Sequence, residues 1–86
     1  MIERIRYMTN LYEEIEHILL YSDNVRDDLV KIKDKIEELE KYYTGPEWME
    51  DFEADNEGLI PKDMNRGILT EDAIYDLLCS VDEIRK

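Results

Sequence analysis

The sequence predicts an all-α protein, in which an antiparallel helical hairpin packs with a short helix and a C-terminal helix. Three observations lead to this prediction. Apolar residues recur at steps of three and four along most of the chain, which is the period of an α-helix. No segment alternates apolar and polar residues over a useful length. No Asn-Gly or Asp-Gly pair joins two apolar runs, as the turn of a β-hairpin would.

Residues 2–21 carry an apolar stripe that predicts the first helix. The stripe alternates steps of three and four, and Leu11 and Ile18 widen it. Residues 25–43 carry a second stripe without Gly or Pro, so we expect one continuous helix there. The first stripe consists of Ile5, Met8, Tyr12, Ile15 and Leu19. The second consists of Val25, Leu29, Ile32, Ile36, Leu39 and Tyr43.

The two stripes are out of phase, which bears on how the helices are joined. Continuing the first stripe predicts an apolar residue at position 26, where the chain has Arg26. Ser22-Asp23-Asn24 lies at this slip, and all three residue types cap helix N-termini. The pattern favours a break, so that two helices of about 30 Å fold back as a hairpin over residues 1–43. One long bent helix is the alternative, because phase slips also occur inside continuous coiled coils.

Thr44-Gly45-Pro46 marks the end of the second predicted helix. Gly45 is suited to the left-handed conformation that often follows a helix, and Pro46 is suited to the first position of a new one. We therefore expect a short helix over residues 46–55, followed by a turn at Gly58.

The last third of the chain is expected to form a C-terminal helix. Pro61 is suited to start a single helical turn, which Gly67 would close. Thr70 is a typical N-cap residue. Glu71 and Asp72 would then lie in the first turn, where the helix dipole favours negative charge. The buried face of this helix would consist of Ile74, Leu77, Leu78 and Val81.

The charge is strongly acidic and unevenly distributed. The 86 residues include 23 acids and 11 bases, a formal charge of −12. Residues 1–45 hold 11 acids and 7 bases, whereas residues 46–86 hold 12 acids and 4 bases. This composition disfavours nucleic acid and anionic membranes as partners, because both are bound through Lys and Arg. A chain of this length is expected to form a single domain over residues 1–86, with the amphipathic hairpin at 1–43 and an acidic remainder at 44–86.

Three features of the sequence bear on its location in the cell. The longest apolar run, residues 18–21, is far shorter than the roughly 20 residues that span a membrane. Cys79 is the lone cysteine, which excludes an intrachain disulfide and fits a reducing compartment. The start, Met1-Ile2-Glu3-Arg4, lacks the basic and then apolar pattern of a signal peptide. We therefore expect a cytoplasmic protein.

Two patterns are similar to metal sites, and neither is complete. Residues 53–64 match the start of a calcium-binding loop, but Pro61 falls at position nine and Met64 stands where a bidentate Glu closes the coordination sphere. Glu14 and His17 form one Glu-x-x-His motif, whereas a di-iron centre needs two. His17 also lies at least about 160° from the apolar stripe, so it is expected to face solvent. The sequence thus predicts no metal, no cofactor and no catalytic residue.

Arg66 is one of the few bases in the acidic half and is expected to pair with a carboxylate. Asp51, Asp55 and Asp72 are its candidate partners. An arginine can hold a carboxylate through two parallel hydrogen bonds, so the favoured interpretation is a structural clasp between the short helix and the last one. The alternative is an anchor for an anionic ligand or for a partner's carboxylate.

Aromatic residues gather in the same region. Tyr42, Tyr43, Trp48, Phe52 and Tyr75 are spaced as core residues usually are, and Trp48 is expected to pack beneath the short helix. The alternative is an exposed cluster that anchors a partner, since Trp, Tyr and Arg dominate interface hot spots. The candidate clasp or partner residues are therefore Tyr42, Trp48, Asp51, Asp55, Arg66, Glu71 and Asp72.

Residues 42–78 resemble domain-of-unknown-function family 4298, a family of small bacterial proteins. Its most specific part is the Arg-Gly-x-Leu-Thr-Glu-Asp run at residues 66–72, in which Ile68 and Thr70 stand where the family pattern has Val and Ser. Residues 1–41 match only as a generic amphipathic region. The resemblance implies a bacterial, cytoplasmic, helical protein and carries no activity. It rests on Tyr42-Tyr43, Trp48, Asp51-Phe52, Asp55, Gly58, Pro61, Arg66 to Asp72, Tyr75 and Leu77-Leu78.

The function that the sequence favours is a small acidic, non-enzymatic module that binds or regulates a protein. Its acidic half would meet a basic protein surface, or its hairpin would dock on a partner helix. One alternative is a nucleic-acid mimic that inhibits a DNA-binding protein with carboxylates in place of phosphates. Another is an enzyme or metal-binding protein centred on residues 48–72. Self-association is also expected, because two amphipathic helices over a thin core leave apolar surface uncovered.

Overall fold

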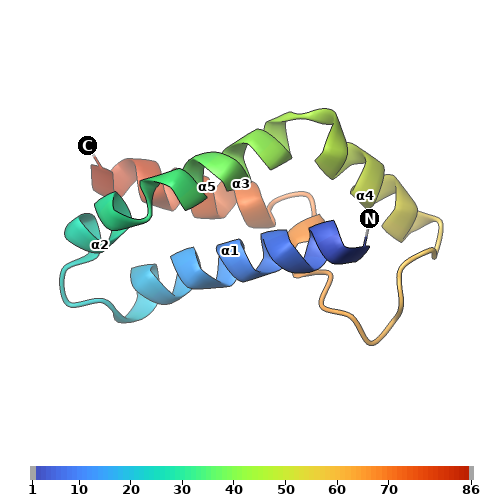
Figure 1. Ribbon diagram of the computed structural model, residues 1–86, viewed down its shortest axis with the longest axis horizontal. Helices are drawn as coiled ribbons and strands as arrows, with labels where there is room; N and C mark the ends of the chain where they lie inside the picture. The colour runs from blue at the N-terminus through green and yellow to red at the C-terminus, as the bar shows by residue number, and fades with distance from the viewer. Residues whose placement is uncertain (1, 86) are drawn as a thin grey trace.

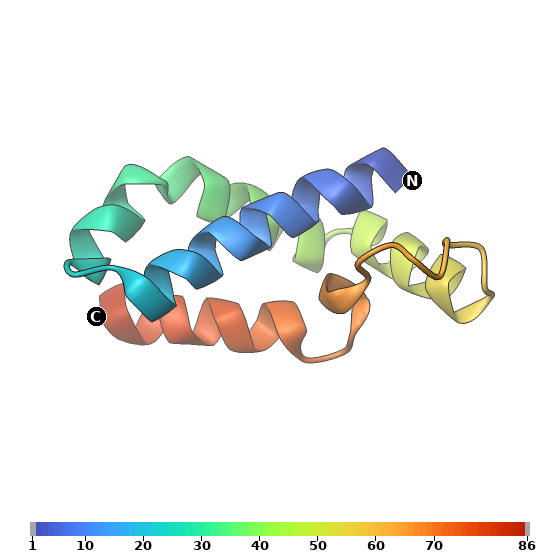
Figure 2. The same ribbon diagram turned by 90° about the horizontal axis from the view of Figure 1, so that it is seen from below.

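The structure, a computed structural model that describes residues 2–85, is all-α, as the sequence predicts. The helix α1 (Ile2–Tyr21) and the last helix, α5 (Ala73–Arg85), lie alongside the return segment, which consists of α2 (Val25–Lys31) and α3 (Lys33–Thr44). The helix α4 (Pro46–Asn56) extends from one end of them (Figures 1 and 2). The long dimension of the molecule is 40 Å. The 3₁₀ turn η1 (Gly67–Leu69) lies between α4 and α5 along the chain.

The chain reverses between α1 and α2, so that α1 and α3 run antiparallel (Figure 1). Asn24 caps α2, since its side-chain oxygen accepts the backbone N–H of Asp27 at 3.4 Å. The Ser22 hydroxyl donates to the Asp28 carboxylate at 2.5 Å, and this bond connects the loop after α1 to the first turn of α2. The predicted break is therefore present, and the hairpin, not the single bent helix, is the arrangement of residues 2–44.

The prediction of one continuous helix over residues 25–43 is wrong, because Ile32 separates α2 from α3. Its backbone lies outside the helical region, at φ −111° and ψ 26°, and its N–H bonds to the carbonyl of Leu29, one residue short of the α-helical partner. The two halves also have different neighbours. Both α2 and α3 pack on α1, but α2 also packs on α5 and α3 also packs on α4. Tertiary packing overrides the local helical pattern here.

Gly45 separates α3 from α4 in an extended conformation, at φ −95° and ψ −176°, and not in the left-handed one that we expected. Glycine is needed for another reason. A Cβ at this position would lie 2.9 Å from the carbonyl oxygen of Lys41. Pro46 occupies the first turn of α4, as predicted, and the helix ends at Asn56, one residue beyond the expected end.

The loop after α4 turns at Gly58, which has a positive φ of 75°. No helical turn starts at Pro61, contrary to prediction. The N–H of Met64 bonds to the Pro61 carbonyl at 3.1 Å in an isolated turn. The helical turn of this segment is η1 instead, where Ile68 and Leu69 are both buried in the core. Burial of these two adjacent apolar side chains places the turn at Gly67–Leu69.

The start of α5 is later than predicted. The Thr70 hydroxyl does not cap α5 but donates to the carbonyl of Gly67 at 3.0 Å. The backbone N–H of Asp76 donates to the carbonyl of Asp72 at 2.8 Å, and α5 begins at Ala73. Glu71 and Asp72 therefore precede the helix. The expected buried face is present, with Ile74, Leu77 and Val81 buried and Leu78 half-buried.

The hydrophobic core draws on all of the helices, η1 and the loop before it. Burial of a large apolar side chain stabilises a fold by about 1.5–3 kcal/mol, so these contacts supply most of the favourable free energy. The buried core residues are Ile5, Ile15, Leu29, Ile36, Leu39, Tyr42, Trp48, Ala54, Ile60, Ile68, Leu69, Ile74, Leu77 and Val81.

The left-handed conformation of Gly58 yields a prediction about stability. A Cβ there would meet nothing within 4 Å, so the cost of a substitution is purely conformational. Gly58→Ala should lower stability by about 1 kcal/mol, and Gly58→Asn by less, because Asn tolerates the left-handed region. Urea denaturation followed by circular dichroism measures both. Equal midpoints for Ala and Asn would show that the turn does not hold this conformation.

Candidate functional site

Asp51 lies on the buried face of α4, between Trp48 and Ala54, and its side chain is 0% exposed. An ionised carboxylate in such a position must be paired and hydrogen-bonded, because leaving water is costly for a charge. The structure supplies this pairing from two other helices, α1 and α3.

Arg4 of α1 binds the Asp51 carboxylate through two parallel hydrogen bonds. The Nε atom donates to Oδ2 at 3.0 Å, and Nη2 donates to Oδ1 at 2.6 Å. This two-bond geometry is the strongest that an arginine and a carboxylate form. The hydrogen bonds that Arg4 donates to Asp51 hold the pKa of the Arg4 guanidinium above its ordinary value.

Tyr42, near the end of α3, completes the network. Its hydroxyl donates to Oδ2 of Asp51 at 2.7 Å in a buried position. Burial raises the pKa of the phenol well above its ordinary value, and the hydrogen bond to Asp51 raises it further. Tyr42 is therefore a neutral donor at physiological pH. We call Arg4, Tyr42 and Asp51 the buried network; it connects α1, α3 and α4.

Arg4 also reaches two exposed acids of α4. Its Nη1 donates to Glu47 at 2.9 Å, and Nη2 lies 3.5 Å from Glu50. Both of these carboxylates are more than half exposed, so water competes for them and each pair contributes little. The buried contact with Asp51 is the one that fixes α4 against the hairpin.

Trp48 is buried beneath α4, as predicted, and its indole N–H donates to the carbonyl of Ile68 at 2.9 Å. The ring stacks on Phe52 at 5.0 Å and meets the edge of Tyr43 at 5.1 Å between centroids. These contacts join α4 to η1. Tyr75 departs from the expectation of a core position, since it is 56% exposed on α5.

Arg66 forms the expected ion pair, and its partner is Asp55, with 2.6 Å between Nη1 and Oδ1. The clasp connects α4 to the residue that precedes η1, and not to the last helix as predicted. Glu71 and Asp72 lie apart from it, exposed in the turn before α5. Of the predicted set, the structure thus joins Tyr42 with Asp51 and Asp55 with Arg66.

Arg4 is the residue that the sequence interpretation missed. The available signal was the spacing of Asp51, which lies three residues from Trp48 and three from Ala54, on what is the buried face of a helix. A carboxylate at such a position requires a cation, and that requirement could have directed attention to the bases of the N-terminal helix.

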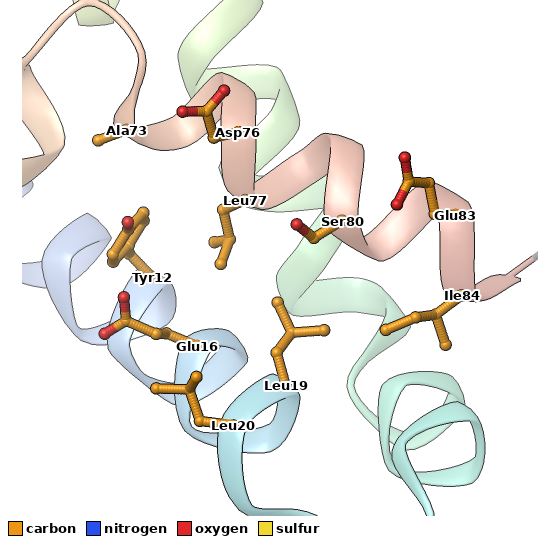
Figure 3. A pocket seen from close by; sticks show the side chains of 10 residues that line it. All are labelled: Tyr12, Glu16, Leu19, Leu20, Ala73, Asp76, Leu77, Ser80, Glu83 and Ile84. Atoms are coloured by element: carbon orange, nitrogen blue, oxygen red, sulfur yellow. The ribbon is translucent and has the colours of Figure 1, made fainter.

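A groove of about 530 Å³ lies between α1 and α5, which run in the same direction (Figure 2). Its lining consists of residues of α1 and α5, Ala73 at the start of α5 among them, and includes none from α4. Leu19 of α1 and Leu77 of α5 point toward each other across it, and Ile84 lies beyond them (Figure 3). Leu20, also part of its lining, is 66% exposed. We call this the α1–α5 groove.

The α1–α5 groove carries carboxylates on both walls. Glu16 lies on the α1 wall, and Asp76 and Glu83 lie on the α5 wall (Figure 3). None of the three has an ion pair with any residue between 2 and 85. Burial raises the pKa of the Tyr12 phenol in this groove, and the charges of Glu16 and then Asp76 raise it further. Charges from both walls therefore act on the same side chain, that of Tyr12.

The other residues that could bind a metal or react chemically lie apart from one another. His17 is exposed on α1, as predicted, and its ring lies 5.0 Å from that of Tyr21. Cys79 is half-buried on α5. Within the described part of the chain, no three His, Cys, Asp or Glu side chains are arranged to hold a metal ion. No helix between residues 2 and 85 combines the length and hydropathy that a membrane crossing requires.

A sequence model described as "Domain of unknown function (DUF4298)" matches residues 5–86. The chain belongs to this family. The match is wider than the resemblance at residues 42–78, because it includes nearly all of α1 and both halves of the return segment. The DUF4298 match thus covers the hairpin of this chain together with α4 and α5. Comparisons with curated proteins and with solved structures gave no match.

The buried network predicts a large stability effect. Asp51→Ala leaves the Nε atom of Arg4 and the Tyr42 hydroxyl without their acceptor, which should lower the free energy of unfolding by about 3 kcal/mol. Glu50→Ala is the matched control, since it removes an exposed acid from the same arginine. It should change stability by less than about 0.5 kcal/mol. Chemical denaturation measures both, and similar losses in the two variants would refute the central role of Asp51.

The Arg66 clasp predicts a smaller effect. Its side chain is 39% exposed, so solvent weakens the pair and Arg66→Ala should cost about 0.5 kcal/mol, or a few degrees in melting temperature. Lys62→Ala is the control, because it removes an exposed base from the same loop. An unchanged melting curve for Arg66→Ala would favour the alternative, in which Arg66 anchors an anionic ligand.

Proposed function

We propose that this protein is a non-enzymatic module that binds a basic surface of a partner protein and thereby regulates it. A bacterial, cytoplasmic setting is part of the proposal and is supported by the lone Cys79 and by the family resemblance. The support comes from the charge balance, from the contacts of the polar side chains, and from the exposed apolar residues.

The contacts of the candidate residues support a structural role for them. Asp51 and Tyr42 are buried in one network, Trp48 donates to a backbone carbonyl, and Arg66 pairs with Asp55. A catalytic group must reach substrate, whereas these polar atoms are occupied by the protein itself. The polar chemistry of this region serves the fold, which leaves the outer surface as the part available for function.

The observation that carries the proposal is the unbalanced negative charge of that surface. The chain has a formal charge of −12, and the basic side chains of Arg4, Lys35 and Arg66 are already bound to its own carboxylates. The acids Glu16, Asp76 and Glu83 have no ion pair among the described residues and lie beside the exposed Leu20. Such a surface attracts basic proteins and sets their orientation.

Affinity capture from native lysate tests the proposal. The tagged protein should retain a basic partner in stoichiometric amount at about 50 mM salt, and retention should fall at about 500 mM salt, because salt screens exposed charges. Leu39→Pro is the control. It keeps the formal charge of −12 but breaks α3 at a fully buried position, so it presents the acids without the fold.

Equal capture by the parent and by Leu39→Pro would mean that the chain acts only as a polyanion, and the proposal would fail. The absence of any stoichiometric partner would also count against it. A captured DNA-binding protein whose DNA is displaced by this chain would instead identify a nucleic-acid mimic.

A further inference from the structure

We propose that the α1–α5 groove binds one face of a basic amphipathic α-helix belonging to the partner protein. This inference rests on the proposed function and assigns it a surface and a ligand class. The groove is separate from the buried network, which lies at the N-terminal end of α1, whereas the groove follows the later turns of the same helix (Figures 1 and 3).

The dimensions of the groove fit a helix of two to three turns. Its lining covers residues 12–20 of α1 and residues 73–84 of α5. At 1.5 Å per residue these spans are about 12 and 16 Å long, which equals two to three helical turns. A partner helix with apolar residues at positions i, i+3, i+4 and i+7 would present one stripe of that length.

The apolar lining is suited to such a stripe. Leu19 and Ile84 are only partly buried, although both pack against the core, and Leu20 is largely exposed beside them. A bound partner helix would cover these three side chains and would pack against both α1 and α5. Leu19, Leu20 and Ile84 line the same groove, and apolar side chains that are exposed together are typical of an interaction surface.

The walls of the groove select the charge of the helix. Glu16 stands on one side, with Asp76 and Glu83 on the other, and none of the residues that line the groove is basic. Lys and Arg at both edges of an apolar stripe would lie beside these carboxylates. Their long aliphatic stems would cover the rims while the charged ends pair with the acids. An acidic or neutral helix would lack these contacts.

A second copy of this chain is a poorer occupant. Each copy carries a formal charge of −12, and placing one α1–α5 face on another would bring the carboxylates of both rims together. Like charges at close range oppose such a dimer. The groove therefore favours a partner of opposite charge over self-association through this face.

A designed peptide is the probe for this inference. It has 14 residues, with Leu at positions 3, 6, 7, 10 and 14, Lys at the flanking positions and Ala elsewhere, and both ends are blocked. Two further peptides serve as controls, one with the same composition in scrambled order and one with Glu in place of Lys. Isothermal titration calorimetry gives the dissociation constants, and amide chemical shifts locate the site on the folded protein.

Two matched sets of variants separate the groove from general charge. The triple variant Glu16→Gln, Asp76→Asn, Glu83→Gln should weaken binding of the amphipathic peptide about tenfold. The triple variant Glu53→Gln, Glu57→Gln, Asp63→Asn loses the same charge at distant exposed positions and should stay within about twofold. Leu20→Gln should also weaken binding, whereas Val30→Gln, at a position of equal exposure on α2, should not.

The result expected is tight binding of the amphipathic peptide alone, with the largest shifts in residues 12–20 and 73–84. Equal binding of the scrambled peptide, or equal loss in the two triple variants, would overturn the inference. So would a parent dimer that Leu20→Gln converts to monomer, because the groove would then hold a second copy. If lysate capture succeeds while the groove variants still capture the partner, this inference fails and the proposed function stands.

Discussion

The buried carboxylate of Asp51 is the constraint on which the arrangement of the second half depends. A fully enclosed negative charge is tolerated only while a cation and hydrogen-bond donors hold it, and Arg4 and Tyr42 supply these from α1 and α3. The position of α4 across the end of the hairpin follows from this requirement. With α4 in place, Trp48 reaches the carbonyl of Ile68, and Arg66 reaches Asp55. The long loop after α4 is thereby fixed at both of its ends.

The helices could be predicted from the sequence because their signals are local. Apolar spacing gave α1, and the capping residues around Asn24 gave the break after it. The interruption at Ile32 has no such signal. It arises because α2 and α3 pack on different partners, and those partners are far away in sequence. Gly45 and η1 are similar cases, in which a close backbone approach and the burial of Ile68 decided the conformation.

The candidate site likewise has one part that local sequence signals predict and another that depends on contacts between distant residues. An ion pair of Arg66 with a nearby carboxylate could be predicted because bases are scarce in the acidic half, and Asp55, 11 residues away, is the one of the three candidates that the structure shows. Arg4 and Asp51 are 47 residues apart, and only the buried position of the acid pointed to a missing cation. The α1–α5 groove depends on the parallel placement of two helices from opposite ends of the chain. Its walls could not be assigned before that placement was known.

The separation between Arg4 and Asp51 also has a consequence for the order of folding. The antiparallel helices are joined by a turn of three residues, so they can associate as soon as the first half of the chain has left the ribosome. The contact with Asp51 closes a loop of nearly 50 residues and carries a larger entropic cost. We therefore expect the hairpin to act as the folding nucleus. On this order, Trp48 and its aromatic neighbours would face solvent until α4 docks, and we expect the nascent chain to be most exposed to proteases and to aggregation in that interval.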